Sequence, residues 1–337
     1  MNTMLTRPAP GVTLITARRP IKEDRVPGPT KYLRRLALTA AAAAGLSLLA
    51  APVASAAPSP VDRPVPTTGC HRPSPVPAGT TTLRTLTSGG LVREYTVHVP
   101  ERYRSSRSYP LVLSFHGHKR TSKYQEELSG FSAYDAISVY PQGLPGTDGE
   151  SAWTGAPYSA AADDVLFTSD LLNTLQRELC VDSRRIYATG KSNGGGFVGV
   201  LACRMPGRIA AFAPVAGAFY PQGGECHPSR PAPILDFHGT ADATIPYTGN
   251  PAKGLPTLPD WLAGWADRNG CFPRPIQYSP KTDVTVQRWL GCSLQHYRVE
   301  GAGHVWPSTA PNNDSATPTV INATPVIWNF LLAHRLR

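Results

Sequence analysis

Short apolar runs that end in turn residues recur along the chain from residue 91 onward. Runs of about four to eight apolar residues with such ends are typical of buried strands. Residues 91–99 instead alternate apolar and polar positions, which predicts a strand near the edge of a sheet. The other predicted strands cover residues 111–115, 137–140, 186–189, 211–215, 234–237 and 297–299.

Helical patterns lie between several of these runs and after the last one. They cover residues 164–179, 195–204, 259–268 and 325–334. In the last pattern we expect Thr324 to be the N-cap, with Pro325 at the first helical position. Strands that alternate with helices predict an α/β fold, in which helices cover both faces of a mainly parallel central sheet in a single domain.

In such a sheet, ligands bind beyond the carboxyl ends of the strands. The strand at 186–189 leads into Gly190-Lys191-Ser192-Asn193-Gly194, a Gly-x-Ser-x-Gly turn that presents a nucleophilic serine. Asp242 follows the strand at 234–237, and His304 follows the strand at 297–299. The order serine, aspartate, histidine is that of an α/β-hydrolase. We predict that Ser192 attacks an acyl carbon, His304 takes its proton, and Asp242 orients the imidazole.

Each of these residues has an alternative. Ser192 can be read as an ordinary helix N-cap. Asp236 competes with Asp242, but it lies inside a predicted buried strand, where an unpaired charge is costly. His238 and His296 compete with His304, whose neighbouring glycines favour an exposed catalytic loop.

The loop after the strand at 111–115 reads His116-Gly117-His118. We predict that the backbone N–H groups of His118 and Asn193 form the oxyanion hole. His116 and His118 have the spacing of metal ligands, but no third ligand accompanies them, so no metal and no cofactor is predicted. Asp163 and Asp164 are expected to cap the following helix, with one of them bracing a neighbouring loop. Substrate contact is predicted for residues that lie in loops, namely Trp306, Trp153, His116 and Tyr220. For Trp153 and Tyr220, a packing role is an equal alternative.

The first 56 residues have the pattern of an export signal. Lys31, Arg34 and Arg35 precede an apolar run at 36–50, and Ala54-Ser55-Ala56 supplies a small-residue cleavage site. A membrane anchor is the competing interpretation, but the run is short for a bilayer, so no stable membrane association is expected. Export by the Sec or the twin-arginine route is open, and we expect translation to begin nearer the arginines, at about Val26.

Removal of residues 1–56 changes the picture of the whole chain. The net charge of the 337-residue sequence is +10, and most of that excess lies in the export signal, which argues against a nucleic-acid partner. Residues 57–77 are rich in proline and predict an extended arm. Residues 78–337 are then the catalytic domain.

All six cysteines follow the export signal, and an even number in an exported chain favours disulfides. Position along the predicted strands and helices suggests that Cys180 pairs with Cys203 near the bottom of the sheet. Cys271 and Cys292 would then close a local loop, and Cys70 would tie the arm to Cys226. Zinc is not expected, because no CxxC pair occurs.

Taken together, these motifs resemble secreted α/β-hydrolases of the feruloyl esterase and polyhydroxybutyrate depolymerase type, a carbohydrate esterase group that also holds acetylxylan esterases. The Lys191-Ser192-Asn193 form of the turn looks most like the feruloyl esterase branch. The resemblance runs from about Cys70 to the C-terminus and rests on Phe115-His116-Gly117, Tyr140-Pro141-Gln142-Gly143, Asp163-Asp164-Val165, the segments 190–196 and 237–247, and Gly303-His304-Val305-Trp306-Pro307.

The resemblance implies hydrolysis of feruloyl (hydroxycinnamoyl) esters, either small esters or esters on plant cell-wall polysaccharide. A polyhydroxybutyrate or polyester depolymerase and an acetylxylan esterase are alternatives with the same triad. A polysaccharide-binding protein on a hydrolase scaffold is the non-enzyme alternative.

Overall fold

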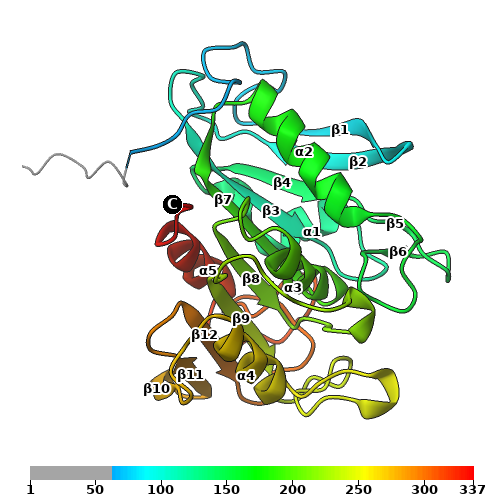
Figure 1. The fold of residues 1–337 in the computed structure, drawn as a ribbon, viewed down its shortest axis with the longest axis vertical. Helices are drawn as coiled ribbons and strands as arrows, with labels where there is room; N and C mark the ends of the chain where they lie inside the picture. The colour runs from blue at the N-terminus through cyan, green and yellow to red at the C-terminus, as the bar shows by residue number, and fades with distance from the viewer. Residues whose placement is uncertain (1–62) are drawn as a thin grey trace, which may run out of the picture. The chain divides into compact units, whose positions relative to one another are not determined.

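A ten-stranded sheet crosses the molecule in the computed structural model, which describes residues 63–337. The strand order is β1-β2-β4-β3-β7-β8-β9-β12-β11-β10, and the strands from β4 to β12 in this order run parallel (Figure 1). The sheet strands span β1 Thr81–Ser88, β2 Leu91–His98, β3 Tyr109–Phe115, β4 Ile137–Pro141, β7 Val181–Lys191, β8 Ala211–Val215, β9 Ile234–Gly239, β10 Ile276–Lys281, β11 Val284–Arg288 and β12 Leu294–Val299. A separate short hairpin joins β5 Leu144–Pro145 to β6 Ser151–Ala152.

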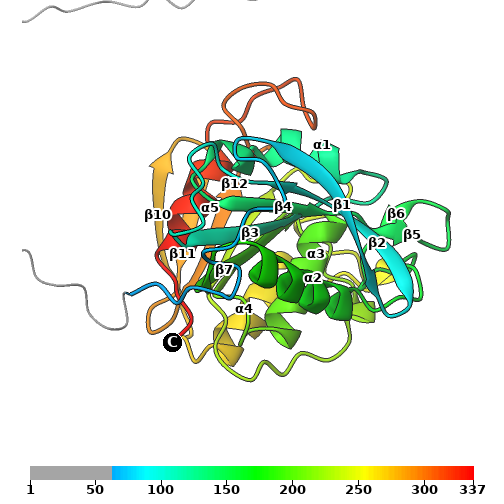
Figure 2. The ribbon, with the colours of Figure 1, turned by 90° about the horizontal axis from the view of Figure 1, so that it is seen from above.

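Helices cover both faces of this sheet, as Figure 2 shows. On one face lie α2 (Asp164–Glu178), α3 (Asn193–Arg204) and α4 (Leu258–Arg268), and on the other lie α1 (Ser122–Ser129) and α5 (Ala323–Leu332). Each face has its own hydrophobic core. Short 3-10 turns at Phe131–Ala133, Pro221–Gly223 and Pro251–Lys253 complete the elements of residues 63–337.

The central strands have the burial expected of a covered parallel sheet. Every residue of β3, β4, β8 and β9 is buried, because helices lie over both sides. This is why those strands read as continuous apolar runs in the sequence. The predicted α/β class and single domain are confirmed.

The two edges of the sheet differ from the prediction. Here β1 pairs antiparallel with β2, and β10 and β11 extend the other edge as an antiparallel hairpin beside β12. The residues of β1 alternate between exposed and half-buried, and those of β10 are all exposed. Edge strands of this kind carry few apolar residues, so an apolar-run pattern does not detect them.

The start of the last helix also differs from the prediction. The N-cap of α5 is Asn322 rather than Thr324. The Thr324 hydroxyl donates to the Ser129 carbonyl at 2.8 Å and accepts from the Trp306 indole at 3.0 Å. Thr324 is therefore a buried link between α5 and α1, and the helix begins two residues earlier than predicted.

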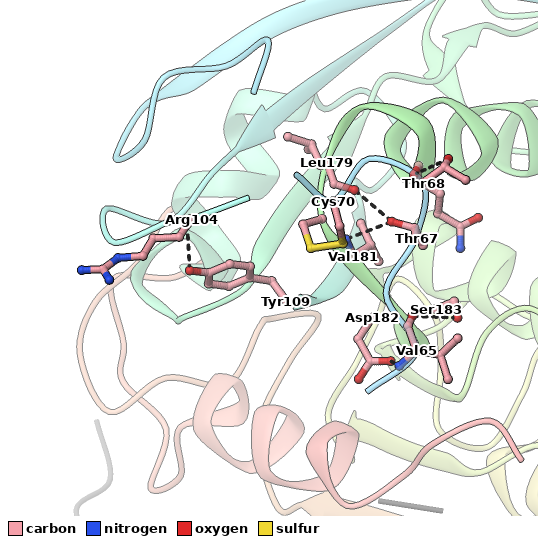
Figure 3. Close-up of a disulfide and its surroundings, with 12 residues drawn as sticks. Val65, Thr67, Thr68, Cys70, Arg104, Tyr109, Leu179, Val181, Asp182 and Ser183 are labelled. Atoms are coloured by element: carbon pink, nitrogen blue, oxygen red, sulfur yellow. Dashed lines mark hydrogen bonds between the residues drawn. A yellow bond between two sulfur atoms is a disulfide. The ribbon is translucent and has the colours of Figure 1, made fainter. Parts of the chain in front are cut away.

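The described part of the arm, residues 63–77, runs beside the start of β7 (Figure 3). Pro66 forms an antiparallel bridge with Asp182, and the Thr67 N–H donates to the Val181 carbonyl at 3.1 Å. The Gly69 N–H donates to the carbonyl of Gln176 in α2 at 3.0 Å. These bonds fix the arm against the bottom of the sheet.

The disulfide prediction is right for one pair and wrong for two. The local pair Cys271–Cys292 forms as predicted. The other cysteines pair as Cys70–Cys180 and Cys203–Cys226. Depth along a strand places Cys180 correctly at the bottom of the sheet but says nothing of its lateral neighbour, and the arm brings the Cα of Cys70 to 4.0 Å from that of Cys180. Cys203 lies in the last turn of α3 and pairs with Cys226 in the segment after β8, not with Cys180.

Within residues 63–337, no helix has the length and apolar character needed to cross a bilayer. The predicted export signal at 1–56, and the part of the arm before residue 63, lie outside the described residues.

Candidate active site

Ser192 is the single residue between the end of β7 and the start of α3. Ser192 has φ 56° and ψ −121°, in the left-handed region that a residue with a side chain rarely adopts. A Cβ added to Gly190 would lie 2.7 Å from the Gly194 carbonyl oxygen, and one added to Gly194 would lie 2.4 Å from the carbonyl oxygens of Phe115 and His116. The two glycines of the Gly-x-Ser-x-Gly motif are therefore required by close backbone contact.

The hydroxyl of Ser192 is available for chemistry. Its backbone is fixed, because the Ser192 N–H donates to Val215 and its carbonyl accepts from Gly196 and Ala218 at 2.8 and 2.9 Å. Within residues 63–337 the Oγ makes no hydrogen bond, and the residue is partly exposed. The loop after β3 packs directly on it, since a Cβ on Gly117 would lie 3.3 Å from the Ser192 Cβ.

Asp242 and His304, which follow β9 and β12, contact each other. The His304 Nδ1 lies 2.7 Å from Asp242 Oδ2. The other carboxylate oxygen of Asp242 accepts the N–H groups of Thr244 and Ile245 at 2.9 and 2.8 Å. The backbone of its own turn thus holds the Asp242 carboxylate in place. Because His304 contacts Asp242 through Nδ1, its Nε2 is left without a partner in the described chain.

The environment sets the charge of this pair. Burial would raise the pKa of Asp242, but the hydrogen bonds from His238 and His304 outweigh it and hold that pKa well below its ordinary value. Burial lowers the pKa of His304, and the charge of Lys191 lowers it further, against the opposing effect of Asp242. A neutral imidazole beside an ionised carboxylate is the state that a general base requires.

The competing acid, Asp236, and one of the competing histidines, His296, form a second buried network. The Asp236 Oδ2 lies 2.7 Å from His296 Nδ1, and the His296 Nε2 lies 2.9 Å from the Tyr247 hydroxyl. Both side chains of the Asp236–His296 pair are 0% exposed, whereas the His304 side chain is 17% exposed. Only His304 can therefore reach a ligand from solvent, which supports the choice of Asp242 and His304.

His238 contacts the same carboxylate as His304. Its Nε2 lies 3.2 Å from Asp242 Oδ2 and 2.8 Å from the Ile245 carbonyl. Burial opposes a charge on His238, but the contact with Asp242 and the charge of Asp236 raise its pKa above the ordinary value. Sequence reasoning missed this role, because only the contact shows that one carboxylate serves two imidazoles.

The two groups predicted for the oxyanion hole border the serine. Within the described chain, the backbone N–H groups of Asn193 and His118 have no acceptor. The Asn193 side chain is tied to the Trp153 backbone by bonds of 2.7 and 3.1 Å, which fixes the first turn of α3. The His118 ring stacks on Tyr158 at 4.0 Å and lies 2.9 Å from the Asp148 carboxylate.

His116 is a buried brace rather than a residue that contacts substrate. Its Nε2 lies 2.9 Å from the Gly143 N–H, so it accepts that bond, and its Nδ1–H then donates to the Gly117 carbonyl at 2.8 Å. Burial lowers the pKa of His116 to about 4. The prediction of substrate contact is corrected: the ring holds the loop beside Ser192 in place.

The two predicted tryptophan contacts are corrected in the same way. Trp153 is 0% exposed and donates its indole N–H to the His116 carbonyl at 3.0 Å. Trp306 is 1% exposed and bonded to Thr324. Large side chains fill the interior even where the chain around them is irregular, so a place in a loop does not imply exposure. Tyr220 is half-buried, and its substrate contact stays a prediction.

Acidic and basic side chains next to the site hold its loops. The Asp163 carboxylate caps α2 through the Leu166 N–H, as expected, and Asp164 pairs with Arg93 at 2.6 Å and accepts the Thr154 N–H. Both expectations for this acidic pair are confirmed.

One further ion pair joins the nucleophile turn to the chain after His304, and the sequence analysis did not find it. Lys191 Nζ lies 2.8 Å from Asp314 Oδ2, and the same carboxylate oxygen accepts the Trp306 N–H at 2.8 Å. Its only sequence signal is a charged residue in an otherwise uncharged turn. Among the described residues, no cluster of three or more histidine, cysteine or acidic side chains could hold a metal ion.

Comparison with known proteins places the chain among esterases. It is 33% identical over 228 residues to feruloyl esterase B of Piromyces equi, which covers 63% of this chain and 42% of that protein. It is 28% identical over 258 residues to a bifunctional acetylxylan esterase/xylanase of Neocallimastix patriciarum, of which it covers 33%. The chain thus spans less than half the length of these two relatives.

A third relative matches over nearly its whole length. The chain is 30% identical over 322 residues to the "Putative esterase NocK" of Nocardia uniformis subsp. tsuyamanensis, which covers 85% of this chain and 91% of that protein. A solved structure described as a thermostable esterase superposes with a TM-score of 0.50 at 17% identity, over 76% of this chain and 63% of the other. No family model matches the chain. Because the match to the putative esterase NocK covers most of both proteins, the chain belongs to the same esterase family as NocK. Its fold is that of the α/β-hydrolases.

Proposed function

We propose that the protein is a secreted serine esterase that hydrolyses hydroxycinnamoyl esters through Ser192, His304 and Asp242. The observation that carries the proposal is the 2.7 Å contact between His304 and Asp242, which follow β12 and β9, at the carboxyl end of the parallel strands, where the strained serine turn after β7 also lies. Strain at a single non-glycine residue persists only where the surroundings impose it, and such strain concentrates at active sites.

The geometry supports a two-step reaction. Ser192 Oγ attacks the ester carbonyl carbon while His304 Nε2 takes its proton, and the N–H groups of Asn193 and His118 receive the oxyanion. His304 then returns the proton to the departing alkoxide, which leaves as an alcohol. Water, deprotonated by the same imidazole, cleaves the acyl-enzyme and releases the free acid and the serine.

The substrate class rests on the relatives. Relatives named as feruloyl esterases support a hydroxycinnamoyl ester, either small or carried on plant cell-wall polysaccharide. The name of the acetylxylan esterase/xylanase supports a second candidate, an acetyl ester on xylan. Neither substrate requires a metal or a cofactor in the reaction above.

Export is supported by the cysteines. All six of them are paired in disulfides, which form and persist in oxidising compartments. The predicted signal at 1–56 accounts for delivery to such a compartment by the Sec or twin-arginine route.

The nucleophile is tested by Ser192→Ala. We expect kcat/KM on methyl ferulate to fall by about 10⁴-fold or more, with unchanged thermal unfolding, because the substitution removes the attacking oxygen alone. Ser106→Ala, at an exposed serine, is the matched control and should keep full activity. Retained activity in Ser192→Ala would place the site elsewhere.

The acyl group is tested by a panel of substrates on the wild-type protein. Methyl ferulate, a short aliphatic nitrophenyl ester, acetylated xylan and a hydroxybutyrate oligomer are compared at equal concentration. We expect the highest kcat/KM on methyl ferulate. Equal or faster turnover of the aliphatic ester or the oligomer would overturn the hydroxycinnamoyl assignment.

A further inference from the structure

A small aromatic hollow lies along α3, one turn beyond the nucleophile. Its volume is about 170 Å³. An engineered apolar cavity of about 150 Å³ is large enough to bind benzene, so this hollow has the size of one six-membered ring. It is lined by one face of α3, the 219–226 segment and α4, whose lining residues include Phe219, Tyr220, Trp261 and Arg268.

The aromatic wall is held together by contacts between its own rings. Phe219 and Trp261 stack with centroids 3.7 Å apart at 11°, and Trp265 meets Trp261 edge-on at 6.1 Å. Phe219, Tyr220 and Trp261 are half-buried, unlike the tryptophans of the core. Aromatic rings that stay partly exposed around a hollow form a ready surface for a flat or ring-shaped ligand.

The wall formed by α3 has glycine where it faces the aromatic rings, and a disulfide fixes its far end. Gly199 faces the Phe219 ring, where an added Cβ would approach to 3.2 Å. The Cys203–Cys226 disulfide ties the end of α3 to the segment that carries the aromatic residues. The hollow is therefore pre-formed, and a ligand pays little to order it.

Backbone separates the hollow from the reacting carbon. The Ala218 N–H donates to the Ser192 carbonyl at 2.9 Å, and a Cβ on Gly196 would lie 2.1 Å from the Ala218 carbonyl oxygen. Gly196 and Gly199 lie about 6 and 10 Å along the helix from Ser192, from the rise of about 1.5 Å per residue. A group bonded directly to the ester carbon cannot pass through that backbone, whereas a ring further along a polymer can lie beside it.

The chemistry of the lining favours a neutral ring with polar edges. Arg268 is the one charged side chain among the lining residues of the described chain, and its Nε–H already donates to the Cys226 carbonyl at 3.1 Å. The faces of a sugar ring carry C–H groups that pack on aromatic side chains, and its hydroxyls bond at the edges. A hydroxycinnamoyl ring carries a phenolic hydroxyl as well, so the position of the hollow beyond the backbone at Ala218, and not its polar edge, is what favours the sugar ring.

We infer that this hollow binds a sugar ring of the polysaccharide that carries the ester, outside the acyl-binding part of the site. The inference rests on the proposed function, since it assigns the carrier side of the same substrate. Trp261 and Phe219 are then residues that distinguish a polymer-bound ester from a small one.

Trp261→Ala tests the inference with two substrates. On a feruloylated xylo-oligosaccharide we expect kcat/KM to fall about three- to tenfold, through a higher KM, because a stacking contact of this kind is lost. On methyl ferulate we expect no change, since that ester has no ring to place in the hollow. Phe272→Ala, at an exposed phenylalanine outside the hollow, is the matched control and should change neither rate.

A second variant fills the hollow instead of opening it. The side chain introduced by Val200→Phe would project into the same space from α3 and should give the same selective loss on the oligosaccharide. This variant keeps the test decisive where Trp261→Ala is poorly folded. An equal loss on both substrates in a folded variant, or no loss on the oligosaccharide, overturns the inference.

Binding separates this inference from the proposed function. Titration calorimetry of the wild-type protein with unesterified xylo-oligosaccharide should show binding that Trp261→Ala weakens. If methyl ferulate is not hydrolysed but this binding persists, the proposed reaction is wrong and the sugar site stands. If methyl ferulate is hydrolysed and no binding occurs, the sugar site is wrong and the reaction stands.

Discussion

At the scale of single residues, Asp242 is shared by two imidazoles. His304 reaches toward solvent and His238 lies wholly inside, yet both contact the same carboxylate oxygen. The shared oxygen keeps Asp242 ionised, while burial keeps His304 neutral. Both pKa values are lowered, which leaves a neutral imidazole beside an ionised carboxylate near neutral pH.

The pH dependence follows from the direction of these shifts. The acid limb of kcat/KM reports the pKa of the essential base in the free enzyme. Because burial lowers the pKa of His304, the neutral form survives to lower pH, and we expect the midpoint of the limb below 6.5. Initial rates on methyl ferulate between pH 4 and 9 measure it, and a midpoint above 7 would contradict the assignment of His304.

Asp242→Asn provides the companion measurement on the same residue. Loss of the carboxylate removes the interaction that raises the pKa of His304 and that fixes its tautomer. The acid limb should therefore move further down, and kcat should fall by about 10⁴-fold.

At the scale of elements, the nucleophile turn requires two glycines, because a Cβ atom at either position would collide with neighbouring backbone. The carbonyl oxygens at the end of β3 lie where side chains on Gly190 and Gly194 would be. The loop after β3 and the first turn of α3 therefore pack backbone to backbone. Neither element can move without displacing the other.

Gly194→Ala tests this packing. The new Cβ would lie 2.4 Å from two carbonyl oxygens, so α3 must shift, and we expect a loss of about 1–3 kcal/mol in the free energy of unfolding together with loss of esterase activity. Gly207→Ala is the control, because no atom lies within 4 Å of its added Cβ. Urea unfolding and methyl ferulate rates measure both variants. Equal stability of the two variants would show that the turn tolerates a side chain.

The sequence predicts the elements around the triad well, and the reason is burial. Strands covered on both faces, such as β8 at Ala211–Val215, must be apolar throughout, so their bounds agree with the apolar run. The edge strand β1 and the short helix α1 face solvent on one side, and every residue of β10 is exposed, so none of the three carries such a pattern. Contact residues fail for a related reason, since the exposure of Trp153 and Trp306 depends on loops that only the folded chain defines.

At the scale of the whole molecule, the disulfides divide into one long connection and two local ones. Cys70 and Cys180 are separated by 110 residues, while Cys203–Cys226 and Cys271–Cys292 are separated by 23 and 21. The long connection joins the arm to the bottom of the central sheet. Its effect on the unfolded chain is therefore the largest of the three.

Removal of each cross-link should show this difference. In the chain-entropy model, the double variant Cys70→Ser/Cys180→Ser loses about 5 kcal/mol at most, and Cys271→Ser/Cys292→Ser about 3 kcal/mol. Urea unfolding of both variants measures the two losses. A larger loss from the local pair would mean that native packing around it outweighs chain entropy.

The ion pair between Lys191 and Asp314 has a consequence for the surroundings in which the protein works. It joins the residue before the nucleophile to the segment that follows His304, and the side chains of Lys191 and Asp314 are only 10% and 2% exposed. At 0.1 M salt, dissolved ions largely screen the interaction between exposed charges that are more than about 10 Å apart, and they screen buried pairs far less. The alignment of the serine turn with the histidine loop is thus insulated from the salinity of the medium.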